Sequence, residues 1–158
     1  MSFGEAIKSV FSKYATFSGR ARRSEYWFFF IFNLLVSFLL LIIDRLLIKV
    51  GCPFPIIYKG VSIGLVTIWA LAVLIPSIAV TVRRLHDTGK SGWLYLPMFL
   101  LNIFAILADV RLLDTSTVIG IITLVLAIIY IVYSIIMLVW LCRDSDSDAN
   151  RWGWNPKF

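Results

Sequence analysis

Charged residues are scarce in this chain of 158 residues, since Asp, Glu, Lys and Arg together make up 15% of it while 60% of the residues are hydrophobic. A soluble domain is typically about 45 to 50% apolar. Histidine occurs once and cysteine twice, which argues against a zinc site with four protein ligands. These shortages indicate lipid rather than water as the solvent, and no metal or other cofactor is expected.

Charges are missing altogether from four long apolar runs. A transmembrane helix needs about 20 residues to cross the hydrocarbon core, with about 17 to 25 tolerated. We therefore predict an all-α membrane protein that forms a single domain, with four transmembrane helices at about 27–43, 61–82, 93–110 and 118–142. The third charge-free run, 93–108, is the shortest and reaches spanning length if Asp109 and Arg111 lie at the headgroup level. The alternative, a re-entrant third segment, would orient the fourth run against the charge distribution.

Most Lys and Arg residues lie before the first run, between the second and third, and after the fourth. The positive-inside rule then predicts that both termini are cytoplasmic and that residues 143–158 form a cytoplasmic tail. The first run lacks the small-residue cleavage pattern of a signal peptide, so it is expected to remain as an anchor. Cys52 and Cys142 fall on opposite sides of the membrane in this topology, which excludes a disulfide between them.

Two further features suit a membrane surface. Apolar residues recur at helical spacing in residues 3–14, which predicts a short amphipathic helix lying in the interface. Trp27, Trp93 and Trp140 occur at the cytoplasmic ends of three spans, where an indole ring is most stable at the headgroup level.

Glycine and proline interrupt the apolar pattern at two places. Gly51, Pro53 and Pro55 predict a turn in the first outer loop. Pro76 lies inside the second run, and because proline has no N–H it should leave the carbonyl one turn earlier without its helical partner.

Three arginines precede the first span within residues 17–27: Arg20, Arg22 and Arg23. Guanidinium groups bind phosphate in a bidentate manner, so this stretch could form a headgroup site. Glu25 would then orient one arginine or lie favourably at the positive end of the first helix. The alternative, an interfacial anchor and topology signal, is the commoner role of such a segment.

The loop between the second and third spans carries a second polar motif, formed by Arg83, Arg84, His86, Asp87 and Lys90. Its glycine at position 89 suits a helix terminus that needs a left-handed residue. His86 and Asp87 could form a proton relay or a metal site, but adjacent residues seldom face the same site. The Gly-Lys-Ser sequence is not a P-loop, because the first glycine of that motif and its preceding strand are absent.

The acidic residues do not form a recognisable metal-binding or catalytic motif. Asp144, Asp146 and Asp148 match the first ligands of a calcium loop, but Ala149 and Asn155 occupy the positions that need Gly and Glu. A solvated acidic stretch is the simpler interpretation. The centre of the spans contains no carboxylate, which argues against a proton-coupled pump and against acid–base catalysis.

At its two basic motifs the chain resembles the bacterial inner membrane family known as domain of unknown function 805, the YhaH-like proteins. The resemblance rests on residues 17–20 and 23–27, on 83–87 with 89–93, and on the tail at 150–153. The Asp/Ser run at 144–148 departs from the glycine-rich lead-in that is usual there. The family has no agreed activity, so the resemblance implies a membrane fold and an inner membrane location only.

We therefore expect a noncatalytic inner membrane protein whose basic cytoplasmic face binds anionic lipid headgroups or a partner protein, through Arg20, Arg22, Arg23, Glu25, Arg83, Arg84, His86, Asp87 and Lys90. A small channel or transporter, working as a homo-oligomer, is the main alternative. A lipid-phosphate enzyme has less support, since only His86 and Asp87 near a basic surface favour it. Nucleic acid is not expected as a partner, because the basic residues adjoin the spans.

Overall fold

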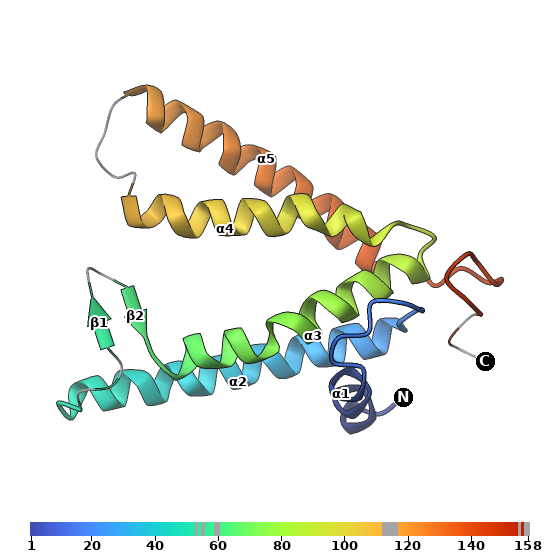
Figure 1. Ribbon diagram of the computed structural model, residues 1–158, viewed down its shortest axis with the longest axis horizontal. Helices are drawn as coiled ribbons and strands as arrows, with labels where there is room; N and C mark the ends of the chain where they lie inside the picture. The colour runs from blue at the N-terminus through green and yellow to red at the C-terminus, as the bar shows by residue number, and fades with distance from the viewer. Residues whose placement is uncertain (53, 55, 59–60, 112–116, 155, 157–158) are drawn as a thin grey trace.

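The computed structural model describes residues 1–52, 54, 56–58, 61–111, 117–154 and 156. Its elements are α1 (Phe3–Ser12), α2 (Arg23–Lys49), strands β1 (Ile56–Tyr58) and β2 (Val61–Ile63), α3 (Leu65–Asp87), a 3-10 helix η1 (Gly92–Tyr95), α4 (Leu96–Arg111) and α5 (Thr117–Cys142). Helices α2 and α3 lie side by side, and α4 and α5 form a second pair (Figure 1). The two pairs meet where α3 ends and diverge toward the other end of the molecule.

Among the residues that the structure describes, three helices are long and apolar enough to cross a membrane: α2, α3 and the part of α5 from Ile121 to Cys142. The predicted helical membrane fold is therefore confirmed. The third predicted span, 93–110, is helical as well, since the 3-10 turn η1 continues into α4, and its described part Gly92–Ile103 is an apolar helix shorter than the three candidates. Exposed apolar side chains cover α2 and α5, as expected of helices that face lipid.

The helix that contains the first predicted span, α2, is longer than residues 27–43, since it begins at Arg23 and ends at Lys49. It continues through Asp44 because that carboxylate is buried and has partners. The Oδ1 and Oδ2 atoms of Asp44 accept hydrogen bonds from the backbone N–H groups of Leu65 (3.0 Å) and Val66 (3.2 Å). These donors have no partner within α3, and the positive end of that helix favours a negative charge.

The predicted start of the second span at Val61 is wrong. Residues 61–63 form β2, which pairs antiparallel with β1 so that Ile56 lies opposite Ile63. Short apolar runs rich in β-branched residues suit a strand as well as a helix, so the pattern alone did not separate the two. Gly64 then starts α3 at a point where a Cβ atom would lie 2.4 Å from an oxygen of Asp44. Gly51 has a φ of +76°, consistent with the predicted turn, whereas Pro53 and Pro55 lie outside the described residues.

Helix α1 ends two residues before the predicted 3–14 boundary. It begins with a capping box, in which the backbone N–H of Ser2 donates to the Glu5 carboxylate (2.9 Å) and lowers the pKa of Glu5. The tyrosine beyond its end, Tyr14, donates its hydroxyl hydrogen to the carbonyl of Ala72. That carbonyl lies four residues before Pro76, so Tyr14 partners the group that the proline leaves free.

Candidate functional site

Most of the polar residues singled out in the sequence meet at one end of the molecule, where α2 begins and α3 and α5 end (Figure 1). Five of them form a buried group that we call the polar knot: Arg20, Glu25, Arg83, Arg84 and Asp87. Each of the five is at most 7% exposed. Buried charges are stable only when they are paired and hydrogen-bonded, so their partners determine what this end of the protein can do.

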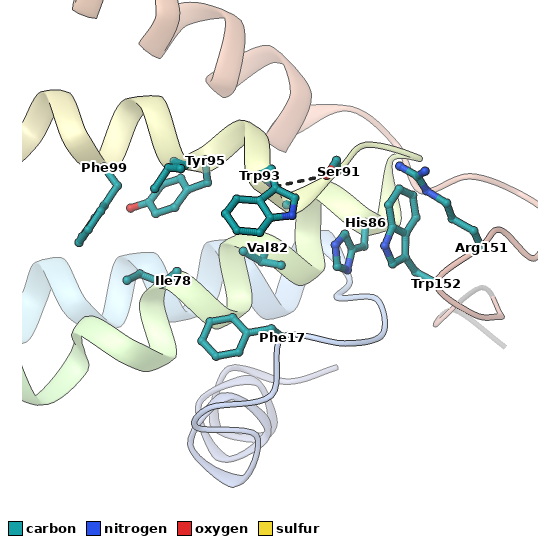
Figure 2. A pocket seen from close by; sticks show the side chains of 12 residues that line it. Phe17, Ile78, Val82, His86, Ser91, Trp93, Tyr95, Phe99, Arg151 and Trp152 are labelled. Atoms are coloured by element: carbon teal, nitrogen blue, oxygen red, sulfur yellow. Dashed lines mark hydrogen bonds between the residues drawn. The ribbon is translucent and has the colours of Figure 1, made fainter.

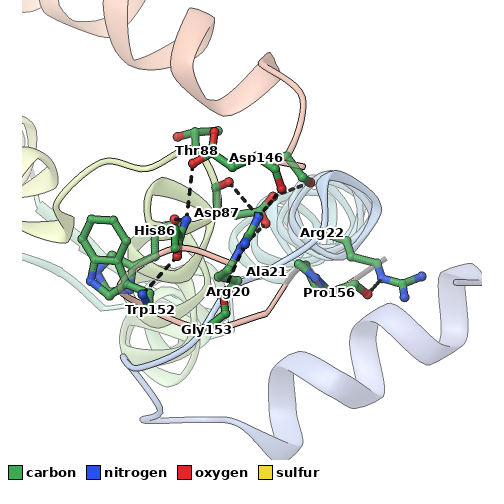
Figure 3. A network of polar contacts seen from close by, with 12 residues as sticks. Arg20, Ala21, Arg22, His86, Asp87, Thr88, Asp146, Trp152, Gly153 and Pro156 are labelled. Atoms are coloured by element: carbon green, nitrogen blue, oxygen red, sulfur yellow. Dashed lines mark hydrogen bonds and ion pairs between the residues drawn. The ribbon is translucent and has the colours of Figure 1, made fainter. Parts of the chain in front are cut away.

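Asp87 is the centre of the knot (Figure 3). It occupies the last turn of α3, and its Oδ1 atom accepts from Nε of Arg20 at 2.9 Å. Its Oδ2 atom pairs with Arg84 and accepts a hydrogen bond from the hydroxyl of Ser145. One carboxylate thus joins the segment before α2, the end of α3 and the tail.

Glu25 and Arg83 form the third ion pair of the knot. Nη2 of Arg83 lies 3.1 Å from Oε1 of Glu25, which also accepts from the hydroxyl of Ser9. Nη1 of Arg83 donates to the carbonyls of Lys13 (3.2 Å) and Thr16 (2.6 Å). Glu25 therefore pairs with an arginine of α3 and not with one of the three arginines of its own segment. It also lies in the first turn of α2, the position that the alternative interpretation gave it.

Backbone carbonyls of the tail complete the knot. Arg20 donates to the carbonyls of Asp146 (2.7 Å), Asp148 (2.8 Å) and Gly153 (3.2 Å). Arg84 donates to the carbonyls of Leu141 (3.1 Å) and Arg143. Three guanidinium groups face two carboxylates, and these carbonyl dipoles offset the positive charge that remains.

The nine residues predicted as one cytoplasmic face that binds anionic lipid or a partner protein are therefore divided in the structure. Arg20, Arg83 and Arg84 are buried with Glu25 and Asp87, because the oxygen acceptors that could have been phosphates are supplied by the chain itself. The corrected placement leaves Arg23 exposed and Arg22 and Lys90 half-buried.

These three accessible cations have weaker partners. Arg23 forms an ion pair with Asp144 at 3.2 Å, with both side chains about half exposed. Arg22 donates to the carbonyl of Pro156, and Nζ of Lys90 lies 4.6 Å from the ring centre of Trp140. Such surface contacts are weak, so a phosphate group could replace them.

His86 and Asp87 face different partners, as expected for adjacent residues. Nδ1 of His86 lies 3.2 Å from the carbonyl oxygen of Gly19 and must donate to it, because a carbonyl only accepts. The imidazole ring stacks on Trp152, with 4.5 Å between ring centres and an interplanar angle of 10°. Gly89 ends the segment with a φ of +73°, which confirms the predicted left-handed residue.

Two of the tail aspartates, Asp146 and Asp148, accept hydrogen bonds from Arg20 through their backbone carbonyls. The Asp144 carboxylate contacts Arg23, and the Asp146 carboxylate accepts a hydrogen bond from Asn150 at 3.4 Å. Among the described residues, no three His, Cys, Asp or Glu side chains form a group that could hold a metal ion. The backbone carbonyls of residues 146, 148 and 153, which accept from Arg20, could not have been recognised from the sequence. Trp152 belongs to the tail motif at 150–153, which could have indicated a structural contact.

The three predicted anchors all occur at the end that contains the knot, since Trp27 is near the start of α2, Trp93 is in η1 and Trp140 is near the end of α5. Trp93 is 78% exposed and the other two are half-buried. Their location at a membrane interface stays a prediction.

Comparison with known proteins gives a consistent picture. The family model described as "Protein of unknown function (DUF805)" matches residues 14–154. Inner membrane protein YhaI of Escherichia coli K12 is 30% identical over 150 residues, which cover 95% of this chain and 93% of that protein. Inner membrane protein YhaH of the same strain is 40% identical over 84 residues, or 53% of this chain and 64% of that protein. No solved structure matches. The apolar helices agree with the membrane location that both names state.

Proposed function

Because the chain belongs to the DUF805 family, and is like its relatives an inner membrane protein, we propose that it is noncatalytic and that its cytoplasmic end binds anionic lipid headgroups. The observation that carries this proposal is the division of the arginines into two groups. Arg20, Arg83 and Arg84 are buried inside the polar knot, whereas Arg22, Arg23 and Lys90, which are near them in the sequence, stay accessible.

The proposed topology has four transmembrane helices, with α1 in the cytoplasmic interface and both termini in the cytoplasm. The third span is η1 followed by α4. Four residues of 3-10 helix and 16 of α-helix extend over about 32 Å, close to the roughly 30 Å of a hydrocarbon core. A helix that looks too short by itself is thus long enough when the 3-10 turn is counted with it.

The two native cysteines provide a test of this orientation. Both are exposed free thiols, with Cys52 at the far end of α2 and Cys142 at the end of α5 beside the knot. A membrane-impermeant maleimide should label Cys52 in intact spheroplasts and Cys142 only after the membrane is opened. Cys52→Ser and Cys142→Ser variants identify the labelled site, and labelling of Cys142 in intact spheroplasts would contradict the orientation.

Anionic lipid is the favoured ligand because the accessible cations lie where headgroups would be. A Lys or Arg near an anionic membrane surface contributes about 1 kcal/mol of attraction. Arg143 and Arg151, which are also exposed, add to the same surface. The ion pair between Arg23 and Asp144 is weak enough for a lipid phosphate to replace it.

The test compares the lipid shell of two variants. Spin-labelled phosphatidylglycerol and phosphatidylcholine are added to proteoliposomes, and the association of each with the protein is measured. The wild type should prefer phosphatidylglycerol. The variant with Arg22→Gln, Arg23→Gln and Lys90→Gln should lose most of this preference.

The control variant carries Arg45→Gln and Lys49→Gln, which removes exposed charges from the opposite end of α2. It should keep the preference of the wild type. An equal preference for phosphatidylglycerol in the wild type and the triple variant would overturn the proposed role in lipid binding. Binding of a protein through Arg22, Arg23 and Lys90 would then favour a partner protein as the ligand.

A small oligomeric channel or transporter stays the alternative prediction. It requires solute flux in proteoliposomes that contain the assembled form, and flux that depends on protein would favour it over the lipid-binding role.

A further inference from the structure

A cavity of about 740 Å³ lies between the end of α3 and the η1–α4 segment, close to the polar knot (Figure 2). Its walls are mainly apolar, with Ile78 and Val82 contributed by α3 and Leu96 and Phe99 by α4. The volume is within the roughly 300–1,000 Å³ range of small-molecule sites. The cavity begins beside the headgroup level of the proposed topology, and its apolar walls continue along the two helices.

One end of the cavity is polar and comes from the tail. Arg151 and Trp152 line it together with His86. The Arg151 guanidinium lies 3.9 Å from the ring centre of Trp152, which in turn stacks on His86. Arg151 is exposed, and no acidic residue is among the described residues that line the cavity.

We propose that this cavity binds one acidic phospholipid of the cytoplasmic leaflet, with an acyl chain between α3 and α4 and the phosphate against Arg151. The proposal rests on the proposed function and specifies one site for it. Charge complementarity identifies the headgroup, because the cation at the mouth faces no lining carboxylate and a guanidinium fits phosphate oxygens. The apolar walls favour an acyl chain rather than a water-soluble phosphate.

The polar knot has a positioning role in this site. Arg20 holds the tail on both sides of the mouth residues, through the carbonyls of Asp148 and Gly153. The side-chain amide of Asn150 also donates to the carbonyl of His86 at 2.9 Å. The segment before α2 and the end of α3 thereby place Arg151 and Trp152 over the cavity.

Native mass spectrometry can count the lipid that each variant retains. The full chain is equilibrated in micelles with phosphatidylglycerol or phosphatidylcholine and then released from detergent. The wild type should retain one phosphatidylglycerol molecule. Leu96→Trp should reduce the retained fraction at least about fivefold by filling the cavity, whereas Leu100→Trp, one turn further along α4 and outside the lining, should not.

A second pair of variants tests the headgroup contact without changing the cavity. Arg151→Gln should reduce the preference for phosphatidylglycerol over phosphatidylcholine about fivefold, the factor expected for one cation near an anionic headgroup. Arg45→Gln removes an exposed charge near the opposite end of α2 that does not line the cavity, and it should leave the preference unchanged.

The outcomes separate this site from the wider lipid-binding surface. Retention of the lipid by Leu96→Trp, or no retained lipid in the wild type, overturns the cavity site even if the spin-label preference is present. Loss of that preference in the variant of Arg22, Arg23 and Lys90, with the single lipid still retained, supports the cavity site independently. If the spin-label preference is absent and the cavity lipid is retained, the surface role fails and the cavity site stands.

Discussion

Two buried carboxylates, Asp87 and Asp44, lie near opposite ends of the α2–α3 pair and are neutralised in different ways. Asp87 pairs with the guanidinium groups of Arg20 and Arg84, which come from separate segments. Asp44 receives two backbone N–H groups from the first turn of α3. The first arrangement joins three parts of the chain, while the second closes one local connection.

The difference shows what each end of the molecule requires. At the knot, the segment before α2 and the tail contain few apolar residues that could bury them, so ion pairs and carbonyl hydrogen bonds hold them in place. At the other end, α2 and α3 already pack together and only the helix start needs a partner. A change at the knot should therefore have larger and more distant effects than a change at Asp44.

The largest effect is expected from Asp87→Asn. This change leaves Arg20 and Arg84 buried without their shared carboxylate, and loss of one partner from a buried ion pair costs about 3–5 kcal/mol. The free energy of unfolding in mixed micelles measures it. A smaller loss of unfolding free energy than that of Asp44→Ala would contradict the expectation that the knot is the more sensitive end.

A smaller loss is expected from Asp44→Ala, at about 1–2 kcal/mol, because a missing helix N-cap costs that much. Asp44→Asn keeps a side-chain oxygen that can accept one of the two backbone hydrogen bonds, and it should lose less. The same unfolding measurement applies. Equal losses for the alanine and asparagine variants would show that the hydrogen bonds to Leu65 and Val66 are not what stabilises this end.

Tyr14→Phe should cost about 1 kcal/mol, since it removes the hydroxyl that donates to the carbonyl of Ala72 and leaves that acceptor unpaired. The control is Tyr14→Phe combined with Pro76→Ala, which restores an N–H at position 76 for the carbonyl of Ala72. The double variant should recover part of the loss, and an unchanged loss would contradict the proposed partnership.

The smallest effect is expected from Arg23→Gln. The Arg23–Asp144 pair is about half exposed on both sides, and pairs of this kind contribute under about 1 kcal/mol. Its unfolding free energy should lie within about 0.5 kcal/mol of the wild type. A loss as large as that of Asp87→Asn would mean that the knot extends to the surface.

The sequence predicted the parts of this fold that depend on long apolar runs. The predicted span 118–142 differs from α5 by one residue at its start, and the helix end marked by Gly89 is confirmed. The hairpin β1–β2 was not predicted, because its apolar residues continue into α3 without a charge that would separate them. Whether a helix continues past Ile43 likewise depends on a contact between Asp44 and a helix that starts 21 residues later.

The arginine motifs were recognised, but their partners were not. A guanidinium group before a membrane span has the same sequence pattern whether it faces a phosphate or a carbonyl of its own chain. The acceptors of Arg20 are backbone oxygens, which every residue possesses, so nothing in residues 146–153 marked them. Only the spatial approach of the tail to the end of α3 distinguishes a buried knot from a lipid-binding face.

Hydrogen exchange of the tail tests this distinction most directly. The amide of Asp146 donates to the carbonyl of Asp87, and those of Asn150 and Gly153 donate to each other's carbonyls. Arg20→Gln should strongly increase exchange across residues 146–153 measured by mass spectrometry, while Arg23→Gln should leave it at the level of the wild type. Unchanged exchange in Arg20→Gln would contradict the account, because the buried arginine would then not be what holds the tail.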